Sequence, residues 1–194
     1  MSRKPTHTAD SLLDAAAELA ATQGAAAVTM SAVAAAVGAP SGSVYHRFPD
    51  RAALLAGLWL RTIDRFQSGF LEALWIDPPQ QAARAAARHV IDWARTHPTE
   101  VAVLLAGPAA FGSAQWSAES AQVAAKQQAR IDDAVGELGD RLGFRSRVER
   151  ERLALLIIEL PYAAVRRCAR KSGAELSDAA EAVDRIVRDA LGVS

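Results

Sequence analysis

The chain has 194 residues, enough for one or two domains with a hydrophobic core, and 51% of them are hydrophobic. Lysine and arginine (22) balance aspartate and glutamate (22), which excludes a diffuse electrostatic binder of nucleic acid but not a protein with a few well-placed cations. A single cysteine, Cys168, excludes an internal disulfide and is typical of a reducing compartment.

The sequence contains no pattern that points to export or to a membrane span. The N-terminal residues lead into an amphipathic segment and not into the apolar core of a signal peptide. The longest strongly apolar run, residues 153–160, is interrupted by Glu159 and is too short to span a bilayer. We therefore expect a soluble, cytoplasmic protein.

Alanine richness and the lack of sustained period-two alternation predict an all-α fold of about nine helices. Gly24 is expected to end the first helix in the left-handed conformation, and Thr29 and Asp50 to cap the second and fourth helices. We expect an N-terminal arm over residues 1–7, then helices from near Thr8 to Gly24, from Thr29 to Gly38 and over about 41–47. A long fourth helix follows Asp50 and runs out near residues 77–79, a fifth reaches Thr96, and a shorter sixth carries residues 101–105. Three further helices are expected over about 117–142, 146–170 and 177–191.

Residues 29–48 have the pattern of a helix-turn-helix, in which a short second helix reads the major groove of DNA. Gly38 supplies the turn, and Val44 and Phe48 are spaced to pack inward as a pair. The nearest cations are Arg47 and Arg51, with Arg3 and Lys4 on the N-terminal arm as further phosphate contacts. Spacing alone also fits an ordinary helical hairpin with a solvated polar face.

A longer set of residues resembles the DNA-binding domain of TetR-family transcriptional regulators. The resemblance covers about residues 12–55, and its motif elements occur in order without gaps. They are Leu12-Leu13-Asp14-Ala15-Ala16-Ala17-Glu18-Leu19, Gly24, Thr29, Val33-Ala34, Gly38, Gly42-Ser43-Val44-Tyr45, Phe48 and Arg51-Ala52-Ala53-Leu54.

The resemblance implies an all-α homodimer with two domains in each subunit. A three-helix DNA-binding domain, expected over residues 1–50, would read a palindromic operator, and a larger helical domain, expected over residues 51–194, would bind a small ligand and dimerise. Carried over by position, the DNA contacts are Thr29, Ser41, Gly42, Ser43, Tyr45, His46 and Arg51, to which Arg47 is added as a neighbouring cation.

Two departures from the family pattern concern the start of the third helix. Pro40 stands where Ser or Thr is common and offers no capping oxygen, so Ser41 or the chain geometry must begin the helix. A lysine is often found at the position of Ser41, so one phosphate contact is missing.

The last two predicted helices each carry an apolar stripe. Their spacing fits packing on the protein's own core and fits a four-helix bundle with a second copy equally well. The resemblance favours the dimer, with interface residues Leu153, Leu156, Leu160, Val183, Ile186, Val187 and Leu191.

Aromatic residues are rare, at 6%, and together with a few polar groups they indicate a ligand pocket between helices, although each of them could simply fill core. Pro161 within a helix would kink that helix and open space. The predicted pocket residues are Trp59, Phe66, His89, Trp93, Phe111, Trp116, Glu159 and Tyr162.

The sequence therefore predicts a transcriptional regulator, in the expected direction a repressor, that a small apolar or amphipathic ligand releases from its operator. The alternative is a ligand-binding helical dimer that has lost operator binding. An enzyme is disfavoured, because the four histidines lie far apart without metal-ligand spacing and no nucleophile elbow or phosphate loop occurs. We expect no cofactor, no metal and no catalytic residues.

Overall fold

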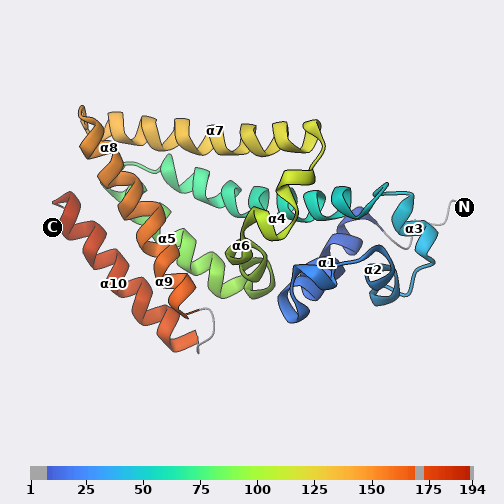
Figure 1. The fold of residues 1–194 in the computed structure, drawn as a ribbon. Helices are drawn as coiled ribbons and strands as arrows, with labels where there is room; N and C mark the ends of the chain where they lie inside the picture. The colour runs from blue at the N-terminus through green and yellow to red at the C-terminus, as the bar shows by residue number, and fades with distance from the viewer. Residues whose placement is uncertain (1–7, 169–172, 193–194) are drawn as a thin grey trace, which may run out of the picture. The chain divides into compact units, whose positions relative to one another are not determined.

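The computed structural model describes residues 8–168 and 173–192, and within these ranges the chain is helical and contains no strand (Figure 1). The predicted arm with Arg3 and Lys4 lies outside the described residues. The α-helices are α1 (Ala9–Gln23), α2 (Met30–Ala36), α3 (Ser41–Tyr45), α4 (Arg51–Leu74), α5 (Pro79–Thr96), α6 (Pro98–Ala110), α7 (Ala118–Arg141), α8 (Arg147–Ala154), α9 (Leu160–Cys168) and α10 (Gly173–Leu191).

Local capping chemistry explains where the N-terminal helices begin. The side chains of Thr8 and Thr29 accept hydrogen bonds from backbone N–H groups in the first turns of α1 and α2, and Asp50 accepts one from the N–H of Ala53 at 2.8 Å. These caps confirm the predicted helix starts. Gly24 ends α1 with φ 85° and ψ 162°, so its φ is positive as expected, but its ψ is extended and not left-handed helical.

Proline and glycine set the later helix boundaries. The break between α4 and α5 contains a cis Asp77–Pro78 peptide, and Pro79 and Pro98 open α5 and α6, where proline's missing N–H leaves no bond unmade. Gly107, with φ 77°, kinks α6 before Pro108. The predicted ends of the fifth and seventh helices, near Thr96 and Leu142, agree with the structure to within a residue.

The segment predicted as one helix over 146–170 is helical from Arg147 to Cys168, its described part, and contains a π-helical turn, η3 (Leu155–Glu159), just before Pro161. The N–H of Leu160 donates to the carbonyl of Leu155, five residues back, so the helix widens where proline cannot donate. With α8, η3 and α9 taken as one rod, the described chain contains nine helical rods, as predicted. The last helix begins at Gly173, four residues before the predicted start.

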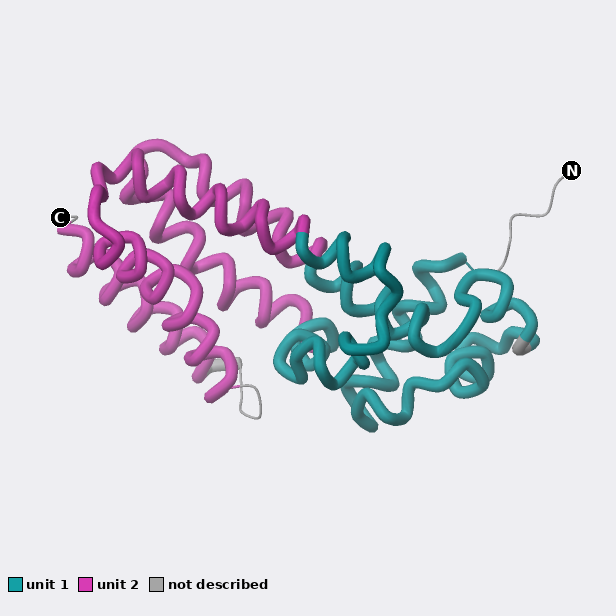
Figure 2. The backbone as a smooth tube through the Cα atoms, turned by 45° about the horizontal axis from the view of Figure 1, so that its top comes forward, with its two compact units in different colours: residues 1–63, 99–125 teal, residues 64–98, 126–194 magenta. Residues whose placement is uncertain are grey.

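The backbone divides into two compact units, coloured separately in Figure 2. Unit 1 comprises residues 1–63 and 99–125, and unit 2 comprises residues 64–98 and 126–194. The units divide α4 at residue 63, so this helix contributes to both. The functional division into residues 1–50 and 51–194 stays a prediction.

The core of unit 1 explains why the first three helices need the start of α4. Leu54, Leu55 and Leu58 of α4 are buried together with residues of α1, α2 and α3. Val103 of α6 and Phe111 join the same cluster, so the segment 99–125 completes this core. The N-terminal helices alone are too few to bury such a cluster.

In unit 2, α5 packs against α9 and α10 through small residues. Ala82, Ala83, Ala86 and Ala87 are buried on one face of α5, where they allow the helices to approach closely. Arg84 on α5 donates from Nε and Nη2 to the two carboxylate oxygens of Asp184 on α10, both at 2.9 Å. None of the described helices is long and apolar enough to cross a membrane.

Candidate functional site

The helix-turn-helix of unit 1 is built on the α2–α3 turn. Gly38 has φ 64°, and the N–H of Ala39 donates to the carbonyl of Ala34 at 2.9 Å, which reverses the chain after α2. Pro40 stands at the N-cap of α3 with φ −58° and ψ 141°, and its carbonyl accepts from the N–H of Ser43 at 2.9 Å. Pro40 makes no side-chain cap bond to α3, as expected for a residue without a capping oxygen.

Helix α3 has one buried face and one exposed face. Val44 is fully buried in the unit 1 core and Phe48 packs against that core, as predicted for this pair. Gly42, Tyr45, His46 and Arg47 are exposed, Tyr45 at 55%, and Ser43 is half-buried. The side chain of Ser41 lies outside the described part of the structure. The helix ends at Tyr45, so His46 and Arg47 lie in the turn that follows.

Arg51 has a structural role that sequence reasoning did not foresee. Its Nε donates to the carbonyl of Val28 at 2.7 Å, and its Nη2 donates to the carbonyl of Ala25 at 2.9 Å. These bonds fasten the start of α4 to the short 3₁₀ turn η1 (Ala25–Ala27) that leads into α2. The hydroxyl of Thr29 caps α2 by accepting from the N–H of Ala32 at 3.1 Å. Arg51 and Thr29 thus both stabilise the start of α2, the helix that precedes the recognition helix α3.

The predicted pocket residues form two separate aromatic groups. In unit 1, the rings of Trp59 and Phe111 lie 5.9 Å apart, and the indole N–H of Trp116 donates to the carbonyl of Phe111 at 2.9 Å. Phe111 is fully buried, which is the core-filling arrangement that the sequence had left open for it.

The second aromatic group lies in unit 2, where α5 crosses α4. Phe66 contacts Trp93 edge-on with ring centres 5.3 Å apart, and the Nε2 of His89 lies 2.9 Å from the carbonyl of Phe66. Burial lowers the pKa of His89 below its ordinary value, and the hydrogen bond to Phe66 opposes this effect. The neutral ring therefore predominates at pH 7 and donates from Nε2. Glu159 is exposed and Tyr162 is half-buried.

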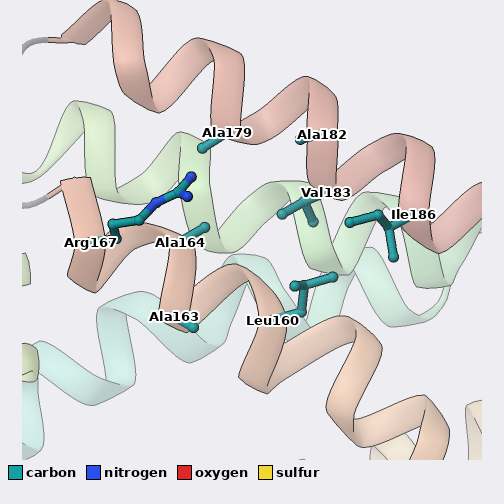
Figure 3. A pocket seen from close by; sticks show the side chains of 8 residues that line it. All are labelled: Leu160, Ala163, Ala164, Arg167, Ala179, Ala182, Val183 and Ile186. Carbon is teal, nitrogen blue, oxygen red and sulfur yellow. The ribbon is translucent and has the colours of Figure 1, made fainter.

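Helices α9 and α10 enclose an apolar groove of about 320 Å³ (Figure 3). Leu160 of α9 and Val183 and Ile186 of α10 project into the space between the two helices. Of the predicted interface residues, Leu153, Val183 and Val187 are buried within the chain and offer almost no surface to a partner. Ile186 is 47% exposed, and Leu156, Leu160 and Leu191 are half-buried, so the predicted interface depends on these four.

Residues 12–58 match the family model of bacterial regulatory proteins of the tetR family. This segment is a DNA-binding domain of the TetR family. The chain thus carries the helix-turn-helix DNA-binding domain of that family, as the resemblance in the sequence predicted, and its all-α fold is that of TetR-family transcriptional regulators.

Solved structures share the fold of this chain over almost its whole length. A TetR-like transcriptional regulator from Rhodococcus sp. RHA1 has 20% identity and a TM-score of 0.69, with 100% of each chain covered. The ketosteroid transcriptional regulator KstR2 of Mycobacterium tuberculosis has 17% identity and a TM-score of 0.70, covering 97% of this chain and 95% of the other.

FadR from Bacillus subtilis, solved in complex with stearoyl-CoA, has 15% identity and a TM-score of 0.68, covering 93% of this chain and 97% of its own. At such identities these likenesses show the fold alone. No curated protein matches the chain.

Proposed function

We propose that this TetR-family chain is a homodimeric repressor that binds a palindromic DNA operator in the cytoplasm and is released by a small apolar or amphipathic ligand. The exposed face of α3 is the observation that supports the proposal. One side of this helix packs on the buried core of unit 1, and the other side exposes small or hydrogen-bonding residues to solvent. The proposed DNA contacts are Thr29, Ser41, Gly42, Ser43, Tyr45, His46, Arg47 and Arg51.

The roles proposed for Thr29 and Arg51 include positioning as well as contact. Both residues hold the turn before α2 through hydrogen bonds to backbone groups, so a change in either would disturb the helix that supports α3. Gly42, Tyr45 and His46 are the residues proposed to meet base edges, because they lie exposed on α3 or in the turn after it.

The proposed link between ligand and DNA is α4. This single helix carries Leu54 and Leu58 in the unit 1 core and Phe66 in the aromatic group of unit 2. A ligand that contacts the aromatic residues on α4 would favour one orientation of this helix and change the separation of two recognition helices in a dimer. No catalytic role is proposed for any residue.

Operator release tests the proposal. A labelled duplex from upstream of the protein's own gene is bound in a gel-shift assay, and compounds that raise the melting temperature of the protein are then added. We expect at least one stabilising compound to weaken DNA binding. Stabilising compounds that all leave DNA affinity unchanged would contradict the coupling.

A second candidate, a ligand-binding helical dimer that does not bind an operator, is favoured by the small number of cations near α3. Within residues 8–51 the described cations are Arg47 and Arg51, and Arg51 already donates to backbone carbonyls. Few phosphate contacts imply a shallow fall of DNA affinity with salt. Absence of any specific shift with the upstream duplex would favour this second candidate.

A further inference from the structure

Arg61, on the last turn that α4 contributes to unit 1, is a half-buried cation whose pairing within the described residues is incomplete. Its side chain is 12% exposed, and Nη1 alone lies 2.8 Å from a carboxylate oxygen of Asp14 and 3.4 Å from one of Asp10. Nη1 also donates to the backbone carbonyl of Asp10 at 3.0 Å. One corner of the guanidinium thus holds α4 to α1.

The opposite edge of the same guanidinium has no partner among the described residues 8–168 and 173–192. Nε and Nη2 of Arg61 are both buried and neither donates a hydrogen bond. The adjacent hydroxyl of Thr62 donates to the carbonyl of Leu58 at 2.8 Å and so is directed along its own helix. Buried N–H groups without an acceptor are rare and costly, more so on a charged group, and they require an explanation.

The unpaired edge has the geometry of a carboxylate receptor. Nε–H and Nη2–H of a guanidinium are parallel and match the two oxygens of one carboxylate. Arg84 uses the same two atoms in this chain, each 2.9 Å from an oxygen of Asp184. Arg61 therefore presents a second such fork, with both donor atoms buried and no acceptor for them in the described part of the chain.

We propose that the Nε–Nη2 edge of Arg61 binds the carboxylate of an amphipathic effector, an inference that rests on the proposed function and names the polar group of its ligand. The buried edge must open to admit the ligand, and the bidentate pair then satisfies both donors. The preference is for a carboxylic acid with an apolar tail over the matching alcohol or amine.

The site connects the effector to α1 directly. A carboxylate on one edge of Arg61 neutralises the charge that attracts Asp10 and Asp14 on the other side of the guanidinium. Binding would weaken the α1–α4 ion pair and loosen the support of the DNA-binding helices, all within unit 1. The ligand would then have a second way to release the operator, besides contact with the aromatic group near Phe66.

Decanoate, decanol and decylamine are the probes, with affinities measured by calorimetry on the full-length protein. Arg61→Lys keeps the charge for Asp14 but lacks the fork, so we expect decanoate affinity to fall by at least about tenfold while decanol affinity is unchanged. Arg84→Lys is the matched control, because its fork already holds Asp184, and it should bind decanoate like the unmodified chain. Circular dichroism confirms that each variant is folded.

Equal decanoate affinity in Arg61→Lys and the unmodified protein would overturn the proposal, and so would absence of decanoate binding to the unmodified protein. Operator release by decanol in both proteins, without discrimination of decanoate, would refute the Arg61 site but leave the proposed function standing. Decanoate binding through Arg61 to a protein that binds no DNA would instead refute the proposed function and keep the site.

Discussion

Alanine at Gly69 tests the crossing of α4 and α5 in unit 2. A Cβ built at Gly69 would lie 2.4 Å from Cε1 and 3.0 Å from Nδ1 of His89, closer than packed atoms approach. The ring must therefore move, which endangers its 2.9 Å hydrogen bond to the carbonyl of Phe66. Overpacking of this kind costs about 1–3 kcal/mol, and a lost hydrogen bond costs about 1 kcal/mol.

Gly136 on α7 provides the matched control. It is also a glycine within a helix, but a Cβ there would meet nothing within 4 Å. Gly136→Ala should stabilise the protein by roughly 0.5–1 kcal/mol through helix propensity alone. Both substitutions share that gain, so the difference between their free energies of unfolding isolates the clash at His89.

Urea unfolding of the two variants measures this difference, which we expect to be about 1–3 kcal/mol. In thermal melts each kcal/mol corresponds to roughly 2–4 °C for a chain of this size. Replacing His89 by Ala in the Gly69→Ala background should remove most of the penalty, since the new methyl group then has space. If Gly69→Ala melts as high as Gly136→Ala, the close packing of His89 on Gly69 is refuted.

Three further predictions concern single side chains. Burial lowers the pKa of His89 in the folded chain, so the stability that its neutral ring contributes is present above the ordinary pKa of about 6.5 and is lost as pH falls through the lowered folded pKa. In thermal melts, the stability advantage of the unmodified protein over His89→Gln should therefore shrink below pH about 6.5. A difference between the two proteins that does not change with pH would contradict this prediction. Arg51→Lys should lower the free energy of unfolding by about 2 kcal/mol, because a lysine cannot bond both carbonyls that the guanidinium bridges. Arg47→Lys, at an exposed side chain without such bonds among the described residues, should change it by less than about 0.5 kcal/mol. Equal effects of the two substitutions in urea unfolding would refute the stabilising role of the Arg51 hydrogen bonds. Ile186→Asp should shift the protein towards monomer in sedimentation while Val123→Asp, an exposed apolar position on α7, should not, and a dimeric Ile186→Asp would place the interface elsewhere.

Local chemistry made much of the helical fold predictable. The side chains of Thr8, Thr29 and Asp50 each accept a hydrogen bond from the backbone N–H three residues further along the chain, in the first turn of the helix that they cap. Pro98 separates α5 from α6 by opening the new helix at its own position. Such signals act over one turn and survive without knowledge of the tertiary fold. The π-helical turn before Pro161 was missed because a proline within a helix can be absorbed in several ways.

The site was less predictable because its interactions join residues far apart in sequence. Arg51 reaches carbonyls near Val28, and Arg61 reaches Asp10 and Asp14 on α1, but no spacing rule connects such positions. The aromatic residues illustrate the same limit. Composition predicted a single pocket set, whereas the structure groups Trp59 with Phe111 in unit 1 and Phe66 with Trp93 in unit 2.

Specific binding of operator DNA by the exposed face of α3 is the central claim, and fluorescence anisotropy tests it most directly. The unmodified protein, Tyr45→Ala and Trp75→Ala are titrated into a labelled duplex from upstream of the protein's own gene, with unrelated DNA as competitor. The two aromatic side chains are matched in exposure, at 55% and 53%, but Trp75 lies in unit 2 outside the helix-turn-helix. We predict competitor-resistant binding that Tyr45→Ala weakens by about tenfold and Trp75→Ala leaves intact. Binding that unrelated DNA displaces equally well, or that both variants reduce alike, would contradict the claim.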